Sequence, residues 1–250
     1  MSILGRAATI LNIIAEGRGR LTLTDLSNRS GLPRSTVHRI VQELEREYFV
    51  IRHARAGGYF LGPGVLKFGM NSHLALVAGM RPSLISLAQA VNENVELALF
   101  SGREVIVVDQ VVSTARMQAV TKIGKSFSLH GSCIGKALLA RLPVSKVRDV
   151  LPPTLQPHTP HTITDVDAFL EELDRVRQTG IAFDREEHDL GISAVAAIVA
   201  GVVGVDHAVA IVAPTERFDG RVRLFVERLK ALQAKAESRA DRHDRARPTG

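Results

Sequence analysis

The chain has 250 residues, 45% of them hydrophobic, which is enough for one large domain or two ordinary ones. Its single cysteine excludes an intrachain disulfide framework and fits a reducing cytoplasm. The net charge of +6 is uneven: residues 1–76 have ten Lys and Arg against five Asp and Glu, whereas residues 77–235 have 18 of each. An excess of positive charge confined to one part of a chain is typical of nucleic-acid binding.

The N-terminus, Met1-Ser-Ile-Leu-Gly-Arg, lacks the basic start and long apolar core of a signal peptide. The longest apolar run, residues 192–205, has 14 residues, fewer than the roughly 20 that a membrane span needs. We therefore expect a cytoplasmic protein with no membrane partner.

The first 46 residues predict three helices. Leu4, Leu11 and Ile14 belong to a helical apolar stripe. Thr22 is a good N-cap for the next helix, with Asp25 at capping-box spacing, and Gly31 is a stop signal. Pro33 suits the first position of a third helix. Two helices joined by a short turn that contains Gly are typical of a DNA-reading helix-turn-helix.

The third predicted helix has an apolar stripe at Val37, Ile40, Val41 and Leu44. Its opposite face is polar, and side chains of these types can donate to base edges or phosphates in the major groove. An ordinary solvated helix face is the alternative interpretation. The predicted DNA-contacting residues of this helix are Arg34, Ser35, Thr36, His38, Arg39 and Gln42.

A hairpin follows directly, with strands predicted at residues 49–52 and 58–61 around a small-residue turn. A hairpin in this position is the wing of a winged helix-turn-helix, and it decides against the solvated-face interpretation. Arg52 and Arg55 lie at its tip, where they could meet phosphate or a minor groove.

The remaining elements mix helices and short β-branched strands. We predict helices at residues 82–92, 131–142, 164–178 and 221–238, and a loop with four prolines at residues 151–162. Strands are predicted at residues 95–100, 105–112, 117–121, 181–184, 192–199 and 208–213. Strands and helices without βαβ regularity indicate an α+β domain with a mainly antiparallel sheet.

The predicted domains are a winged helix-turn-helix at residues 1–63, a linker helix at 64–79, a second domain at 80–238 and a disordered tail at 239–250. The tail has few apolar residues, which is typical of disorder.

The chain resembles the IclR family of bacterial transcription regulators from about Ile3 to Lys235. The resemblance rests on Gly31-Leu-Pro-Arg-Ser-Thr-Val-His-Arg, Tyr59-Phe-Leu-Gly-Pro, Leu129-His-Gly-Ser-Cys-Ile-Gly-Lys-Ala-Leu-Leu-Ala, His161-Thr-Ile-Thr-Asp and Gly180-Ile-Ala-Phe-Asp-Arg-Glu-Glu. It implies a C-terminal effector-binding domain with a GAF-like fold. It also implies a homodimer or homotetramer that binds operator DNA and a small organic or aromatic acid.

By this resemblance, backbone N–H groups at Gly131, Ser132 and Cys133 would bind the effector, and a helix N-terminus suits a carboxylate. Asp184 matches an acidic pocket position, although its charge run is equally compatible with a solvated loop. Ala194, Ile211 and Ala213 stand where family members often have Cys or Ser. This more apolar wall favours an effector with a hydrophobic or aromatic body over a two-carbon acid.

Other readings of single features are weaker. Residues 131–137 lack phosphate-loop spacing. Cys133 could sense oxidants if a helix N-terminus lowered its pKa, but a small buried side chain is the default. The histidines His158, His161, His188 and His207 show no metal-ligand spacing, so we predict no metal and no cofactor.

The predicted function is therefore ligand-responsive transcription regulation, with repression favoured over activation. The alternative is an enzyme built on the C-terminal domain, with the helix-turn-helix used only for interaction. The sequence has no nucleophile elbow, metal motif or dinucleotide fingerprint, so we predict no catalytic residues.

Overall fold

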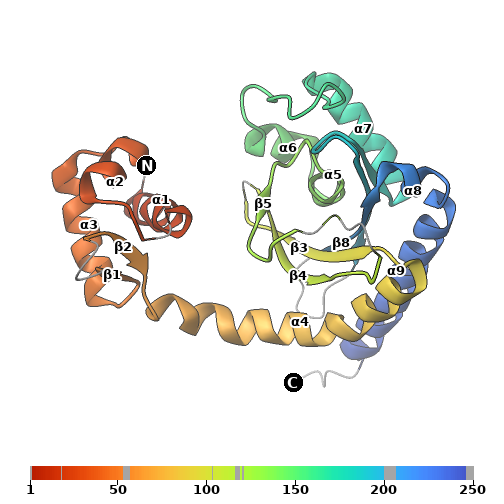
Figure 1. The fold of residues 1–250 in the computed structure, drawn as a ribbon, viewed down its shortest axis with the longest axis horizontal. Helices are drawn as coiled ribbons and strands as arrows, with labels where there is room; N and C mark the ends of the chain where they lie inside the picture. The colour runs from red at the N-terminus through yellow and green to blue at the C-terminus, as the bar shows by residue number, and fades with distance from the viewer. Residues whose placement is uncertain are drawn as a thin grey trace. The chain divides into compact units, whose positions relative to one another are not determined.

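A computed structural model describes residues 2–17, 19–52, 57–102, 104–115, 119, 121–199 and 207–245, with only the backbone described for 69–75 and 239–245. The chain forms two compact units, which divide between Ala75 and Leu76 (Figure 1). No helix among the described residues is both long and apolar enough to cross a membrane.

The first unit contains three helices and a hairpin around a core that includes Ile14, Leu26 and Val41. The helices are α1 (Ile3–Glu16), α2 (Leu23–Ser30) and α3 (Arg34–Arg46), and the strands are β1 (Val50–Arg52) and β2 (Tyr59–Leu61). The strands pair antiparallel, with Val50 opposite Leu61. The winged helix-turn-helix is thus confirmed, although Leu4 of the predicted apolar stripe is 79% exposed.

The turn between α2 and α3 follows from local chemistry. Thr22 and Asp25 form the predicted capping box, in which each side chain accepts a hydrogen bond from the other residue's backbone. Gly31 ends α2 with a φ of 67°, a left-handed conformation that costs glycine little. Ser27 Oγ donates to Leu32 O at 2.7 Å and fixes the chain between the helices. Pro33 precedes α3 as its N-cap, one position earlier than predicted.

A single helix, α4 (Gly64–Val91), replaces the predicted linker and the separate helix from Pro82. Proline within a helix removes one hydrogen bond. Here, however, apolar side chains before and after Pro82, including Met80 and Leu84, pack into the same core. Their burial favours a continuous helix over a break.

The second unit is built on a six-stranded antiparallel sheet in the order β5-β4-β3-β8-β7-β6. The strands are β3 (Asn94–Phe100), β4 (Val105–Val111), β5 (Ser126–Phe127), β6 (Ala182–Arg185), β7 (Ile192–Val199) and β8 (His207–Pro214). The predicted α+β class and mainly antiparallel sheet are confirmed. Of the strand predicted at 117–121, residues 117, 118 and 120 lie outside the described residues.

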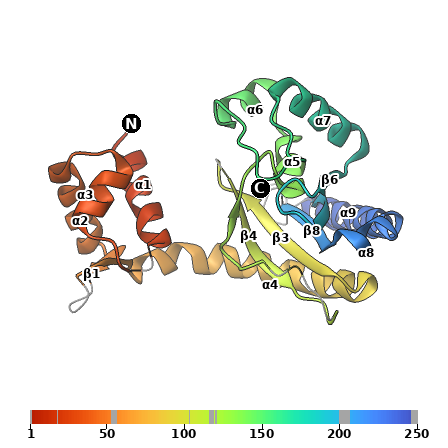
Figure 2. The same ribbon diagram turned by 45° about the horizontal axis from the view of Figure 1, so that its top comes forward.

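Helices cover both faces of this sheet (Figure 2). One face packs against the second half of α4 and against α9 (Val222–Arg245), and the other packs against α5 (Cys133–Leu139) and α7 (Val166–Thr179). The short helices α6 (Val144–Val150) and α8 (Thr215–Asp219) complete the unit and have no counterpart among the predicted elements. Residues 239–245 of the tail predicted to be disordered continue α9 in the structure, while 246–250 lie outside the described residues.

Candidate functional site

The polar face of α3 is the first candidate site. Val37, Ile40, Val41 and Leu44 are buried, so the helix must turn its other side outward. Among the predicted DNA-contacting residues, Thr36 is half-buried and the others on α3 are exposed: Arg34, Ser35, His38, Arg39 and Gln42. Arg46, farther along the helix, pairs with Glu43 at 2.8 Å.

Only one of the two predicted DNA-contacting residues of the wing lies within the described residues. Arg52 is exposed at the end of β1. Arg55 lies outside the described residues. The first unit therefore presents a basic, hydrogen-bonding helix face together with a hairpin strand that ends in an exposed arginine side chain.

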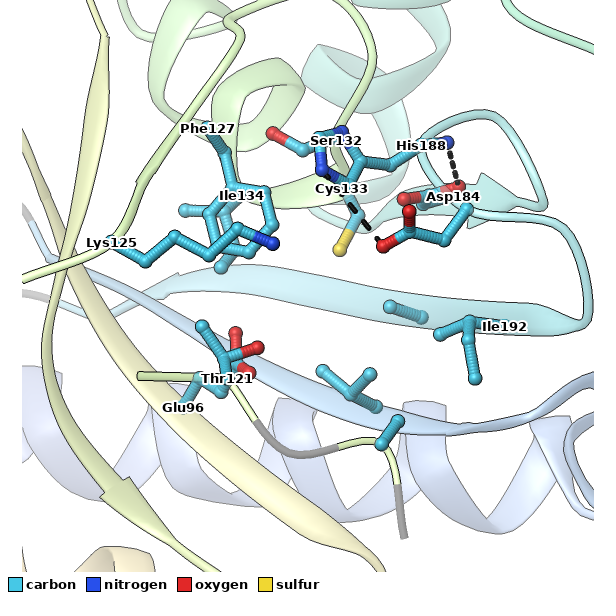
Figure 3. Close-up of a pocket in the computed structure, with 14 residues that line it drawn as sticks. Glu96, Thr121, Lys125, Phe127, Ser132, Cys133, Ile134, Asp184, His188 and Ile192 are labelled. Atoms are coloured by element: carbon cyan, nitrogen blue, oxygen red, sulfur yellow. Dashed lines mark hydrogen bonds and ion pairs between the residues drawn. The ribbon is translucent and has the colours of Figure 1, made fainter. Parts of the chain in front are cut away.

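The second candidate site is a cavity of about 250 Å³ between the sheet and the start of α5 (Figure 3). Apolar side chains form much of its wall, and polar groups enter it from several elements. Its lining residues are Glu96, Ala119, Thr121, Lys125, Phe127, Ser132, Cys133, Ile134, Asp184, His188, Asp189, Ile192, Ala194 and Val212. Four of the seven residues predicted from the sequence, Ser132, Cys133, Asp184 and Ala194, are among them.

Ile211 and Ala213 were predicted in this wall, and the structure contradicts that prediction. Both are fully buried on the opposite face of the sheet, against α4 and α9. Successive side chains of a strand point to opposite faces. Val212, between them, therefore lines the cavity.

The structure also contradicts the prediction that the backbone N–H of Gly131 binds the effector. It precedes the N-cap Ser132, and its N–H donates to Ser128 Oγ at 3.2 Å instead of facing the cavity. A Cβ at this position would lie 2.5 Å from Cδ2 of His158, so glycine is required for close packing. The helix begins at Cys133, and Ser132 Oγ caps it by accepting from Gly135 N at 3.1 Å.

Asp184 lies deep in the cavity wall, 7% exposed. Its Oδ1 accepts hydrogen bonds from the N–H groups of Glu187 at 2.7 Å and His188 at 3.4 Å. Burial nevertheless raises the pKa of Asp184 to about 7. The carboxyl group therefore titrates near neutral pH. Its burial does not agree with the alternative prediction of a solvated loop.

Cys133 is buried, and burial raises the pKa of its thiol well above the usual value. A redox-sensing cysteine needs the opposite shift, because the thiolate is the reactive form. The structure thus supports the small buried side chain over the oxidant sensor.

Three histidine rings, those of His130, His158 and His188, lie close together, and His188 lines the cavity. The ring centroid of His158 lies 5.5 Å from that of His130 and 5.1 Å from that of His188. The ring centroids of His188 and Phe127 are 4.7 Å apart. Burial lowers the pKa of both His130 and His188, so these rings favour the neutral form. Within the described residues, no group of three His, Cys, Asp or Glu side chains is arranged to hold a metal ion.

Several lining residues were missed from the sequence, above all Glu96, Lys125 and Val212. Glu96 did carry a signal, because it is an acidic residue in the middle of the apolar strand Asn94–Phe100. Lys125 carried none, since a lysine in a polar connection is ordinary. In Figure 3, Lys125 points into the cavity on the same side as Glu96 and Thr121, and Asp184 lies across from them.

Comparison with known proteins agrees with this architecture. Residues 4–53 match the IclR helix-turn-helix domain, and residues 69–239 match the bacterial transcriptional regulator IclR C-terminal domain. The chain is 38% identical to the HTH-type transcriptional regulator Rv1719 of Mycobacterium tuberculosis, over 95% of this chain and 92% of that protein. It is 33% identical to the transcriptional repressor IclR of Escherichia coli, over 78% of this chain and 73% of that protein.

Solved structures show the same fold. A regulator of this type from Silicibacter sp. TM1040 has a TM-score of 0.87 at 28% identity, covering 96% of each chain. An IclR homologue from Microbacterium hydrocarbonoxydans, crystallised with 4-hydroxybenzoate, has a TM-score of 0.74 at 23% identity, covering 95% of this chain and 98% of that one. The matched domains and relatives are transcription regulators and not enzymes. The chain belongs to the IclR family of bacterial transcriptional regulators, with a DNA-binding helix-turn-helix domain and a C-terminal effector domain.

Proposed function

We propose that this regulator is a repressor whose DNA affinity changes when a small organic or aromatic acid enters the cavity above β7 and β8. The observation that carries the proposal is the cavity itself, because it combines apolar walls with a few converging polar groups. Relatives named as repressors, including IclR and AllR of Escherichia coli, support the direction of control. The protein acts in the cytoplasm, where operator DNA is found.

The proposed DNA-reading surface is the exposed side of α3, led by Arg34, Arg39 and Gln42. Arginine and glutamine can each form bidentate hydrogen bonds to base edges in the major groove. Ser35, Thr36 and His38 would add contacts to bases or phosphates from the same helix. Arg52 and Arg55 would reach the backbone or minor groove from the wing.

We further propose that residues 1–63 act as the DNA-binding domain, 64–79 as a linker helix and 80–238 as the effector domain. The division of the chain into compact units between Ala75 and Leu76 supports this organisation. The linker corresponds to the first part of α4.

The proposed effector is a weak acid on an aromatic or aliphatic body. Lys125 supplies a cation, and the first N–H groups of α5 beside Cys133 add hydrogen-bond donors. Phe127, Ile192 and Val212 supply the apolar wall. A volume of about 250 Å³ suits a single ring, and the relative crystallised with 4-hydroxybenzoate supports this class.

The proposed assembly is a homodimer or homotetramer. One recognition helix covers a short half-site, so a specific operator requires at least two, about 34 Å apart or a multiple of that. Large apolar side chains are exposed in the first unit: Ile3 (63%), Leu4 (79%), Leu66 (60%) and Phe68 (71%). Pairing with a second copy would cover some of these side chains.

The test begins by selecting preferred duplexes from random DNA with the full chain. Operator affinity is then measured by gel shift with and without a panel of aromatic and aliphatic acids. We expect a two-fold symmetric sequence and at least one acid that weakens binding, because a ligand shifts the equilibrium only if it binds the two states unequally. A protein without sequence preference, or one whose DNA affinity no acid changes, contradicts the proposal.

A further inference from the structure

Glu96 is a carboxyl group buried in the cavity wall. Its neighbours Val95 and Leu97 point toward α4 and α9, so strand alternation directs Glu96 to the cavity face. The residue is 2% exposed. Burial of an ionised carboxylate is costly unless a partner compensates for it.

Gln110 is opposite Glu96 in the β3–β4 register, and its side chain contacts the Glu96 carboxyl. The oxygen and nitrogen of a side-chain amide exchange positions when the amide group rotates by 180°. In one of the two orientations, the Gln110 amide matches its donor and its acceptor to the backbone of Thr121. In that orientation its nitrogen donates to Thr121 O at 2.6 Å and its oxygen accepts from Thr121 N at 3.0 Å. The amide atom 3.3 Å from Glu96 Oε1 is then the oxygen. Two unprotonated acceptors repel each other, whereas a proton on Glu96 turns the contact into a hydrogen bond, so this geometry favours the protonated form.

The surroundings of Glu96 act on its pKa in opposite directions. Lys125, in the connection before β5, favours the ionised form, as does a hydrogen bond from Thr121. Desolvation opposes both and is the larger effect, so the pKa of Glu96 is raised above its ordinary value. The other titratable groups that line the cavity are Cys133, Asp184, His188 and Asp189. Burial lowers the pKa of His188, which favours its neutral form, and the other three add no positive charge.

We propose that Glu96 is a specificity-determining residue that stays uncharged and hydrogen-bonds an uncharged hydroxyl group of the effector. The inference rests on the proposed function, and it narrows the effector class to hydroxylated weak acids. Because the proton of Glu96 is engaged by the Gln110 oxygen, the carboxyl offers the effector its remaining acceptor capacity, which matches the O–H of a hydroxyl group. An ammonium group at this place would instead require Glu96 to ionise, and an apolar edge would leave its hydrogen-bonding capacity unused.

The protonation is tested without any ligand. Carbon-13 NMR of the full chain, labelled at glutamate side-chain carboxyls, follows each group through a pH titration, and the Glu96 signal is the one absent from Glu96→Gln. We expect the Glu96 carboxyl to remain protonated at the pH of the binding experiment, where the exposed glutamates of the chain are ionised. A Glu96 carboxyl that is already ionised at that pH overturns the proposal.

Recognition is tested by calorimetric titration of the full chain with benzoate, 3-hydroxybenzoate, 4-hydroxybenzoate and benzylamine. We expect at least one hydroxybenzoate to bind about tenfold more tightly than benzoate, the effect of one well-formed hydrogen bond. Glu96→Gln, which has nearly the same shape and is uncharged, should keep that preference. Glu96→Leu, which removes the hydrogen-bonding group, should lose it.

The outcomes separate the two proposals. If the acids bind but benzoate binds as tightly as the hydroxybenzoates, or if Glu96→Gln loses the preference, the role of Glu96 is wrong while the acid effector stands. Tightest binding of benzylamine also overturns the uncharged role of Glu96. If the wild-type chain binds none of the acids, the proposed effector class is wrong and hydroxyl recognition fails with it.

Discussion

Lys136 and Glu187 form an ion pair of 2.6 Å in which both side chains are almost completely buried. Lys136 also donates to Phe183 O at 2.9 Å and lies 3.5 Å from Glu172 of α7. This lysine therefore ties α5, which covers the cavity, to β6 and to α7. The pair holds Glu187 beside Asp184, whose carboxyl accepts the Glu187 N–H.

Removing the lysine should strongly destabilise the effector unit. Lys136→Met leaves Glu187 as a buried charge without its partner, which costs about 3–5 kcal/mol of unfolding free energy. The measurement is urea denaturation followed by circular dichroism. The control is Lys146→Met, because Lys146 pairs with Asp149 at 3.5 Å on the surface, where such pairs contribute about 0–1 kcal/mol. If the two substitutions lower the free energy of unfolding equally, the buried pair is no more important for stability than the surface pair.

The raised pKa of Asp184, about 7, predicts a pH-dependent stability. Between about pH 4, the ordinary aspartate pKa, and pH 7, the folded chain keeps a proton that the unfolded chain has lost. The free energy of unfolding should therefore fall as the pH rises through this window and then level off.

The matched variant is Asp184→Asn, whose amide oxygen can still accept from Glu187 N while the titration is removed. Melting temperatures of both proteins at pH 5 and pH 8 provide the comparison. The wild type should lose more stability than the variant between these pH values. If the wild type and the variant lose equal stability between pH 5 and pH 8, or if the variant loses more, the assigned pKa shift is contradicted.

The exposed side of α3 predicts a sequence-specific loss of DNA affinity. Arg39→Ala should cost about 1–3 kcal/mol, concentrated at particular base pairs, if Arg39 reads bases. If it contacts only phosphate, the loss should be uniform across sequences and the salt dependence should become shallower. Gel shifts on wild-type and base-substituted operators separate these cases. Arg148→Ala, the same change at an exposed arginine of α6, should leave DNA affinity unchanged.

The opposite orientations of Ile211 and Val212 predict opposite effects of substituting them. Val212→Phe places a ring in the cavity and should abolish the response to a bound acid, with DNA affinity in its absence retained. Ile211→Ala leaves a hole in the core beside α4 and α9 and should cost about 2–5 kcal/mol of stability, with the ligand response retained. Operator affinity with and without acid, together with a urea denaturation curve, tests both. The assignment of faces is wrong if Ile211→Ala alone loses the ligand response.

Local patterns determined much of the fold. The capping box at Thr22 and Asp25 and the left-handed Gly31 could be recognised from neighbouring residues, because each depends on contacts within a few positions of the chain. The main strands were recognised in the same way, from short runs of β-branched residues. The polar face of α3 followed from helical periodicity alone.

Only the tertiary structure decided which face of each strand meets the cavity. Alternation requires Ile211 and Val212 to point in opposite directions, but which of them faces α5 depends on which helices cover the sheet. The continuity of α4 through Pro82 likewise depends on packing against the sheet. The close approach of Glu96 to Gln110, and of Lys136 to Glu187, joins residues far apart in sequence, and no local pattern records such distances. The sequence therefore determined most of the elements and the family, whereas the chemistry of the cavity arose from the packing of surfaces that are distant along the chain.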